Sequence, residues 1–116
     1  MEGTHAVIHI KTAYIDDDAV IAKGRYADGS TALLLSDAET GEQLAKATVC
    51  MVEYGEKPRD ENHVFIKDYA ENQGMVAALQ DAGVIGKVLR SLDAGYAKLG
   101  VHECKLLDLD AVEELP

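Results

Sequence analysis

Residues 63–85, HVFIKDYAENQGMVAALQDAGVI, decide the fold of this chain. The apolar run at 63–67 is typical of a short strand, and a group of polar residues follows it. An amphipathic pattern comes next, with apolar residues three or four positions apart, and it predicts a helix over 69–82. This one stretch therefore predicts a junction between a strand and a helix.

The two ends of the predicted helix carry recognisable signals. Asp68 is the expected N-cap, and Glu71 completes a capping box, in which side chains accept N–H groups that the helix leaves unpaired. Gly83 is the expected residue just beyond the C-terminal end. Gly74 is unfavourable inside a helix, so a later start with Asn72 as the N-cap is the alternative.

Alternating apolar and polar positions, separated by polar turns, predict strands in the rest of the chain. We expect a turn at 16–18, a hairpin turn at 28–29, and a short helical turn in the acidic tail, 108–116. The predicted strands, besides 63–67, are 6–14, 20–27, 31–36, 43–54, 84–92 and 101–107. The expected fold class is α+β: an antiparallel sheet of about six or seven strands, beginning with a meander, packed against one main helix. Residues 1–116 should form a single domain.

Charge limits the classes of partner. The chain carries 21 acidic and 11 basic residues, for a net charge of −10. Such a surface repels phosphate backbones and anionic lipids, so we expect neither direct nucleic-acid binding nor membrane binding. Solubility is one explanation of the acidity, and complementarity to a basic protein surface is the other.

The two cysteines, Cys50 and Cys104, are too few and too far apart for a disulfide framework. The N-terminal residues lack the pattern of a secretory signal, and we found no long apolar run that would span a membrane. The expected location is the cytoplasm, where a lone cysteine in an apolar strand is a small buried hydrophobe.

The sequence contains no familiar catalytic motif, phosphate loop or metal-binding pattern, so we expect no enzyme, no cofactor and no metal site. The densest group of polar side chains lies at the strand-to-helix junction. Two interpretations are open, a binding surface and a purely structural helix cap, with acid–base work by Asp68 and Glu71 as a third. The candidate binding residues are Lys67, Asp68, Tyr69, Glu71, Asn72, Gly74 and Arg25.

Two stretches, TALLLSDAETGEQLAKATV at 31–49 and VFIKDYAENQGMVAALQDAGVI at 64–85, carry a resemblance, together with Gly95 and Cys104. They resemble a family of small uncharacterised proteins from phages, prophages and plasmids, with a VFIKDYxENxGM-type motif. This chain has Ala70 and Gln73 where the family pattern has Ser and Glu. The resemblance implies a genomic setting and no catalytic residue.

Charge, missing catalytic motifs and resemblance together favour a non-enzymatic binding protein of a phage or mobile element. The first hypothesis is a counter-defence factor that acts as an inhibitor by occupying the surface of a host defence protein. The first alternative is an oligomeric sponge that sequesters a signalling nucleotide or another small anionic ligand. The second alternative is a small enzyme that uses Asp68 or Glu71 as a base.

Overall fold

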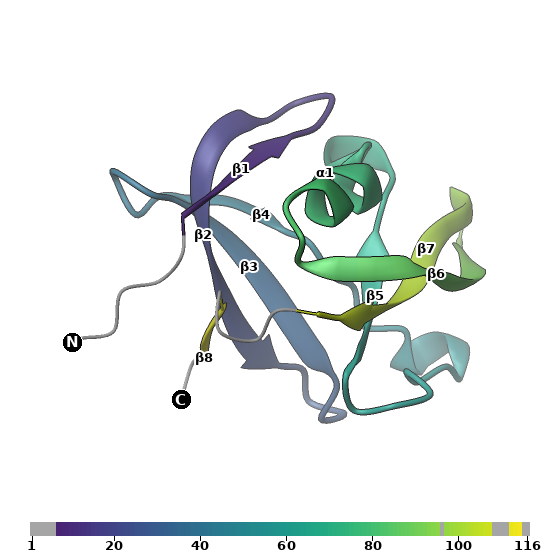
Figure 1. The fold of residues 1–116 in the computed structure, drawn as a ribbon. Coiled ribbons are helices and arrows are strands. Elements are labelled where there is room, and N and C mark those ends of the chain that lie inside the picture. The colour runs from purple at the N-terminus through teal and green to yellow at the C-terminus, as the bar shows by residue number, and fades with distance from the viewer. Residues whose placement is uncertain (1–6, 96, 108–111, 115–116) are drawn as a thin grey trace.

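A computed structural model describes residues 7–95, 97–107 and 112–114 of the chain. Within these residues, four antiparallel strands form the first sheet, in the order in which they occur along the chain (Figure 1). A short strand, β8 (Val112–Glu114), adds to this sheet parallel to β2. The predicted N-terminal meander is therefore confirmed. Its strands are β1 (Ile8–Lys11), β2 (Asp16–Arg25), β3 (Thr31–Asp37) and β4 (Gln43–Lys46).

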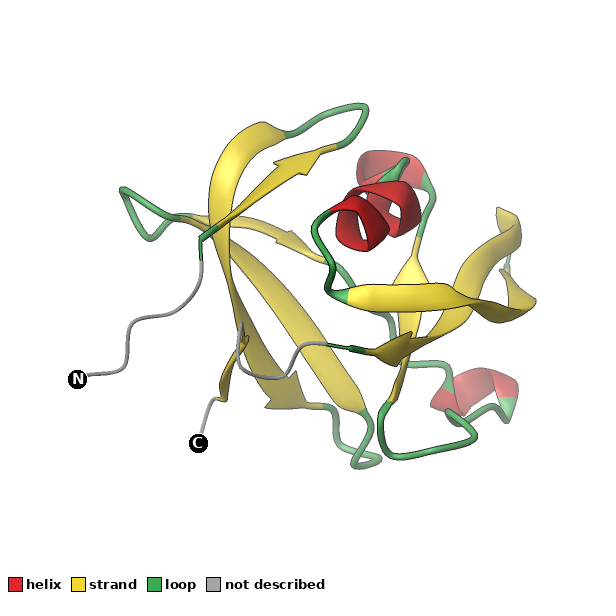
Figure 2. Ribbon diagram, viewed as in Figure 1, coloured by secondary structure: helices red, strands yellow, loops and turns green. Residues whose placement is uncertain are grey.

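The second sheet has three strands, β5 (His63–Lys67), β6 (Ile85–Ala94) and β7 (Ala97–Leu106), in the order β5-β7-β6. The helix α1 (Met75–Asp81) connects β5 to β6 and contacts both, as well as β1. Because β7 runs antiparallel to β5 and to β6, these two strands are parallel to each other. This is a split β-α-β unit. Seven antiparallel strands and one main helix confirm the predicted α+β class (Figure 2).

Residues 47–49 join the two sheets. The Ala47 carbonyl accepts a hydrogen bond from Lys67 N–H at 2.9 Å, and Val49 N–H donates to the Phe65 carbonyl at 3.1 Å. Ala47 N–H still donates to the Leu33 carbonyl of β3 at 2.8 Å, so the chain passes from β3 to β5 at this residue. The predicted strand over 43–54 is wrong beyond residue 46, because the backbone changes sheets there and then forms a 3-10 turn, Val52–Tyr54.

The main core lies between the two sheets and under α1. Alternate residues of β5 separate two apolar clusters, since successive side chains of a strand point to opposite faces. Val64 and Ile66 join the main core, whereas Phe65 packs on the other face with Met51 and Val101. The main core is aliphatic, as the composition predicts, and its largest fully buried side chains include those of Ile10, Ile21, Leu33, Leu35, Ile66, Met75 and Leu79.

The helix begins later than predicted. A 3-10 turn at Ala70–Asn72 comes first, and α1 follows after Gly74, whose φ of 96° lies in the left-handed region that glycine tolerates. The capping box is wrong, because Glu71 bonds to Lys67 rather than to a helix N–H. The alternative start, with Asn72 as the N-cap, is also wrong, because the Asn72 side chain is buried and bonds to β4 instead.

The C-terminal end of the helix agrees with the prediction. Gly83 has a φ of 77°, and its N–H donates to the Gln80 carbonyl at 3.0 Å. The N–H of Val84 donates to the Leu79 carbonyl at 2.9 Å. This pair of bonds is the Schellman motif, in which a left-handed residue satisfies the last carbonyls of a helix.

Three predicted turns differ from the structure. Residues 16–18 are the first residues of β2, and the turn lies before them, where Thr12 N–H donates to the Ile15 carbonyl at 2.8 Å. The hairpin between β2 and β3 is confirmed, although its connection is longer than two residues and of that predicted pair only Gly29 has a positive φ. In the tail, residues 112–114 form a strand instead of a helical turn. The predictions for residue 6, for 108–111 and for 115–116 lie outside the described residues.

Candidate functional site

Asp68 holds the start of α1 from outside the helix. Its Oδ1 accepts a hydrogen bond from Gly74 N–H at 2.7 Å, and its Oδ2 accepts one from Val76 N–H at 3.0 Å. The carboxylate therefore satisfies two amides that the first turn leaves unpaired, and its negative charge suits the positive end of the helix dipole. A purely structural role as the cap of α1 therefore explains Asp68, and no catalytic role is needed.

Lys67, Tyr69 and Glu71 form one exposed contact beside the 3-10 turn. The Lys67 ammonium lies 2.6 Å from Glu71 Oε2 and 5.1 Å from the centre of the Tyr69 ring. The hydrogen bond from Lys67 holds the pKa of Glu71 below its ordinary value. The cation of this predicted cluster is thus already engaged by a carboxylate and an aromatic ring.

Asn72 lies inside the protein rather than on a binding surface. It is 1% exposed, and its Nδ2 donates to the Lys46 carbonyl at 2.7 Å. Its Oδ1 is buried with no partner among the described residues. Asn72 therefore fixes the 3-10 turn to the end of β4. Gly74 lies close to β1, because a Cβ added to it would be 3.4 Å from Thr12 Cα.

A hollow of about 320 Å³ adjoins this junction, lined by Lys67 and Glu71 and by Lys46 on β4. Lys46 lies over the Tyr26 ring, with its ammonium 5.6 Å from the ring centre. The structure thus brings Lys67, Asp68, Tyr69, Glu71, Asn72 and Gly74 together, as the sequence predicts. Arg25 is separate from them, at the β2–β3 turn.

The most deeply buried ion-pair network was not predicted, and it centres on Glu103 of β7. Glu103 is 0% exposed. Its Oε1 accepts a hydrogen bond from Arg90 Nε at 2.5 Å, and its Oε2 accepts from Arg59 N–H and from His63 Nδ1, both at 2.7 Å. Burial raises the pKa of Glu103, but these three donors outweigh it and hold the pKa below its ordinary value. Glu103 is therefore a charged group inside the protein.

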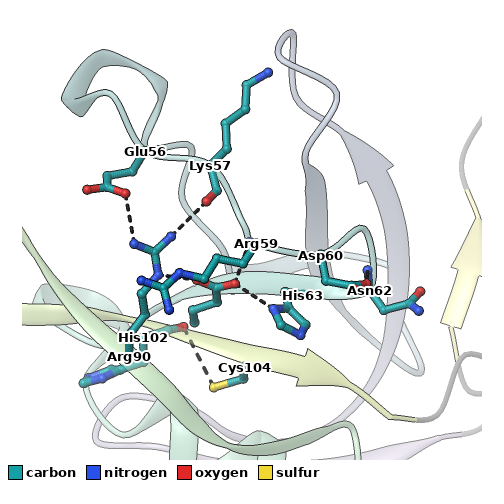
Figure 3. A network of polar contacts seen from close by, with 10 residues as sticks. Glu56, Lys57, Arg59, Asp60, Asn62, His63, Arg90, His102 and Cys104 are labelled. Carbon is teal, nitrogen blue, oxygen red and sulfur yellow. Dashed lines mark hydrogen bonds and ion pairs between the residues drawn. The ribbon is translucent and has the colours of Figure 1, made fainter.

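Arg90 extends this network to the loop that precedes β5 (Figure 3). Its Nη1 lies 3.0 Å from Glu56 Oε1, and its Nη2 donates to the Lys57 carbonyl at 2.9 Å. The guanidinium also lies over the Phe65 ring, 5.6 Å from its centre. We name Glu103, Arg90 and His63 the buried triad. It ties three strands of the second sheet to one loop.

One signal in the sequence points to the buried triad. Glu103 lies between Val101 and Leu106 in a predicted strand, and a charge that is buried in a strand needs partners of opposite sign. The partners come from β5 and β6, so identifying them requires the register of the sheet. Phe65 pairs with Glu103 across β5 and β7, which places His63 on the same face, one diagonal step away.

A second group of charges lies in the first sheet, at the end where β2 begins and β3 ends, away from the β2–β3 turn. His9 of β1 contacts two carboxylates, with Nδ1 2.9 Å from Asp18 Oδ1 and Nε2 2.5 Å from Asp16 Oδ1. The hydrogen bond to Asp18, and next the one to Asp16, raise the pKa of His9. We name this group the acidic end; it surrounds a hollow of about 280 Å³ lined by His9, Asp16, Asp17, Asp18, Asp37 and Glu39.

Other chemical groups offer little for catalysis. Burial raises the pKa of the Cys104 thiol to about 11, so this thiol stays protonated at neutral pH. Within residues 7–95, 97–107 and 112–114, no group of three or more His, Cys, Asp or Glu side chains is arranged to hold a metal ion. None of the helices in that part of the chain is long and apolar enough to span a membrane.

Comparisons of the chain with protein-family models, with curated proteins and with solved structures find no significant match. The resemblance of 31–49 and 64–85 to a phage and plasmid family therefore stays an expectation from the sequence. The function has to be argued from geometry and charge.

Proposed function

We propose that the protein is a non-enzymatic binding protein that occupies a basic surface of a second protein through its acidic end. The setting implied by the resemblance makes this second protein a host defence protein. The chain would then be a counter-defence factor of a phage or mobile element, acting in the host cytoplasm. The clustering of acids at one end of the first sheet is the observation that carries this proposal.

The acidic end is suited to electrostatic recognition. Asp17 and Glu39 are exposed, and neither side chain has an ion pair among the described residues. Asp16 and Asp18 share His9, and Lys11 Nζ lies 3.8 Å from Asp16 Oδ2. The five carboxylates around the hollow outnumber these two basic side chains, so this part of the surface stays negative. A negative patch on a chain of net charge −10 attracts a basic partner and discriminates against acidic ones.

The carboxylates suggested as catalytic bases have other roles. Asp68 accepts two backbone hydrogen bonds at the start of α1, and Glu71 is paired with Lys67. A general base needs a lone pair that can reach a substrate proton. Both side chains are committed to the fold, which supports binding rather than catalysis as the proposed function.

A pair of matched double variants tests the proposal. Asp17→Asn with Glu39→Gln removes two exposed charges from the acidic end, whereas Glu53→Gln with Asp81→Asn removes two exposed charges elsewhere. Proteins captured from a bacterial lysate on the immobilised wild type are identified, purified and titrated against all three forms. We expect one basic partner whose affinity falls about tenfold or more in the first variant, and falls with added salt.

Two results would contradict the proposal. One is a partner that binds both double variants with the same affinity as the wild type. The other is wild-type binding that does not change between low and high salt, because exposed charges more than a Debye length apart are screened at high salt. Circular dichroism of both double variants checks that they are folded, so that a change in affinity can be attributed to the removed charges.

Sequestration of a small anionic ligand is the second candidate, and the hollow beside Lys67 favours it. Lys46, Lys67 and the Tyr26 ring line this hollow, a combination that suits a nucleotide. It ranks second because Lys67 is already paired with Glu71. Light scattering and a thermal-shift series with nucleotides test it, and a monomer whose melting temperature no nucleotide raises would exclude it.

A further inference from the structure

A separate pocket lies between the β2–β3 turn and the loop that precedes β5. Its volume is about 270 Å³, and its walls are residues 25 and 28–31 on one side and 57–61 on the other. The two segments lie side by side at the lower end of both sheets in Figure 1. A water molecule takes about 30 Å³ of liquid, so the pocket has room for a small solute. We name it the loop pocket.

His63 lies at the boundary between the loop pocket and the buried triad. Glu103 is charged, so it accepts hydrogen bonds and donates none. The proton on His63 must therefore be on Nδ1, which faces Glu103 at 2.7 Å. Nε2 has no hydrogen-bond partner among the described residues, and the side chain is 19% exposed. The buried carboxylate thus fixes the ring and leaves Nε2 for the pocket.

Two of the three acids in the lining already accept hydrogen bonds from neighbouring residues. Asp28 Oδ1 accepts from the Ser30 hydroxyl at 2.5 Å and from the Ser30 N–H at 2.9 Å. Asp60 Oδ1 accepts from Asn62 N–H at 2.9 Å. Asp28 Oδ2 is buried with no hydrogen-bond partner among the described residues, so it is still available as an acceptor beside the pocket. Glu61 is exposed, at the outer rim of the loop.

The cations of the lining are less engaged than the acids. Arg25 uses Nη1 for the Gly29 carbonyl and for Thr31 Oγ1, at 3.2 and 3.4 Å, so its other N–H groups have no partner among the described residues. The Lys57 side chain makes no ion pair there, and it points away from Arg90 in Figure 3. The pKa of Asp28 is lowered mainly by Ser30, with a smaller effect of the Lys57 charge, which places Lys57 near the facing turn.

We propose that the loop pocket binds a small oxyanion that carries an acidic hydroxyl, a hydrogen phosphate group. Lys57 and Arg25 supply opposite charge from the two walls, and His63 Nε2 accepts a hydrogen bond from the hydroxyl of the phosphate. The position of this ring is set by the buried triad, so His63 is ordered before a ligand arrives. A surface with a net charge of −10 repels anions, and an anion site on it has to collect cations locally. The inference goes beyond the proposed function and does not depend on it.

An NMR titration tests the loop pocket directly. Sodium phosphate is added to ¹⁵N-labelled protein at constant ionic strength, kept constant with sodium chloride, and separate titrations use sodium sulfate and sodium acetate. We expect saturable changes in the amide signals of both walls, residues 28–31 on one side and 57 and 59–61 on the other. Acetate and sulfate carry negative charge but no acidic hydroxyl near neutral pH, so we expect both to bind more weakly than phosphate.

Single-charge variants identify the contacts. Lys57→Gln and Arg25→Gln each remove one proposed contact from an exposed position, and each should weaken binding about tenfold, as expected for a hydrogen bond to a charged group. Lys87→Gln removes an exposed lysine of β6, outside the pocket lining, and should leave the affinity unchanged. Signal changes that never saturate with any of the three anions would overturn the proposal. Affinity that survives both Lys57→Gln and Arg25→Gln would also overturn it.

Discussion

At the scale of single residues, the carboxylate of Asp68 accepts hydrogen bonds from two amides at the start of α1, although Gly74 lies six positions further along the chain. A standard N-cap is the residue that directly precedes the first turn. Here Gly74 occupies that position with no side chain, and Asp68 supplies the missing acceptor from the end of β5. The 3-10 turn between them folds back so that this reach is short.

Replacing Asp68 tests this role. We expect Asp68→Ala to lower the free energy of unfolding by about 1–2 kcal/mol, because both amides lose their acceptor. Glu71→Gln is the control from the same cluster, and it should cost about 0.5 kcal/mol or less, since it breaks an exposed ion pair. Urea denaturation of the two variants and the wild type measures both effects. Equal losses from the two substitutions would contradict the capping role of Asp68.

At the scale of secondary-structure elements, a glycine just beyond a helix and a glycine inside a strand differ in whether they can be replaced by alanine. Gly83 follows α1 with a φ of 77°, and a Cβ added there would meet nothing within 4 Å. Gly86 in β6 has no such positive φ, and a Cβ there would contact the Leu107 side chain at 3.6 Å. The two positions therefore differ both in backbone strain and in the contact that an added methyl group would make.

The same substitution should therefore have opposite effects at the two positions. We expect Gly83→Ala to destabilise the protein by about 1 kcal/mol, because alanine is strained in the left-handed region. Gly86→Ala should be neutral or stabilising by up to about 1 kcal/mol, because glycine weakens a strand and the added methyl gains an apolar contact. Thermal and urea unfolding of both variants provide the measurement. A stabilising Gly83→Ala would show that the Schellman end of α1 is not needed.

Elements defined by local pattern were predictable from the sequence. The strand at His63–Lys67 has the predicted bounds, and Gly83 ends the helix as expected, because both signals lie within a few neighbouring residues. The predicted start of the helix was wrong because the sequence does not show that the Asp68 side chain reaches across a 3-10 turn to Gly74. The strand over 43–54 was too long because the apolar pattern continues after Lys46 while the hydrogen bonds change sheets.

The candidate site shows the same division between local and distant information. Residues 67–74 are neighbours in the sequence, so their proximity in the structure was predictable. The partners of Glu103 come from three separate segments, and only the register of β5, β6 and β7 brings them together. Arg25 belongs to the loop pocket rather than to the predicted cluster for the same reason, because its neighbours at 57–61 are distant in sequence.

At the scale of the whole molecule, pH should change stability through carboxylates whose pKa is lower in the folded state. Glu103 is the buried example, and Asp16, Asp28, Asp37 and Glu71 are lowered as well. A lowered pKa means that the unfolded chain binds protons more readily. The stabilisation is therefore fully present above the unfolded pKa, 4.5 for a glutamate, and it is lost as the pH falls through the folded pKa.

We therefore expect the free energy of unfolding to fall steadily below about pH 4.5. The raised pKa of His9 acts in the opposite sense, because its stabilisation is fully present below the unfolded value of 6.5 and is lost as the pH rises through the folded pKa. Glu103→Gln should cost about 3–5 kcal/mol at pH 7, because Arg90 and His63 lose a buried charged partner, and should flatten the acid dependence. Glu56→Gln, which removes the exposed partner of Arg90, is the matched control and should keep the wild-type slope. Urea denaturation at a series of pH values measures both quantities. A Glu103→Gln variant with the full acid slope would contradict this account.

The split β-α-β unit also dictates an order of events during folding. The β5 strand pairs with β7, which the ribosome makes only after the helix and β6, so β5 cannot complete its ladder on a nascent chain. Until then the backbone of β5 bonds to the 47–49 segment on one side, while its other side has no strand to pair with until β7 is made. Pairing strands that are distant in sequence costs loop-closure entropy before the new contacts stabilise the chain. Folding is therefore slower, and an unpaired apolar strand is exposed to aggregation in the meantime. The N-terminal meander pairs neighbours in sequence, so it can form first and shelter β5 while the rest of the chain arrives.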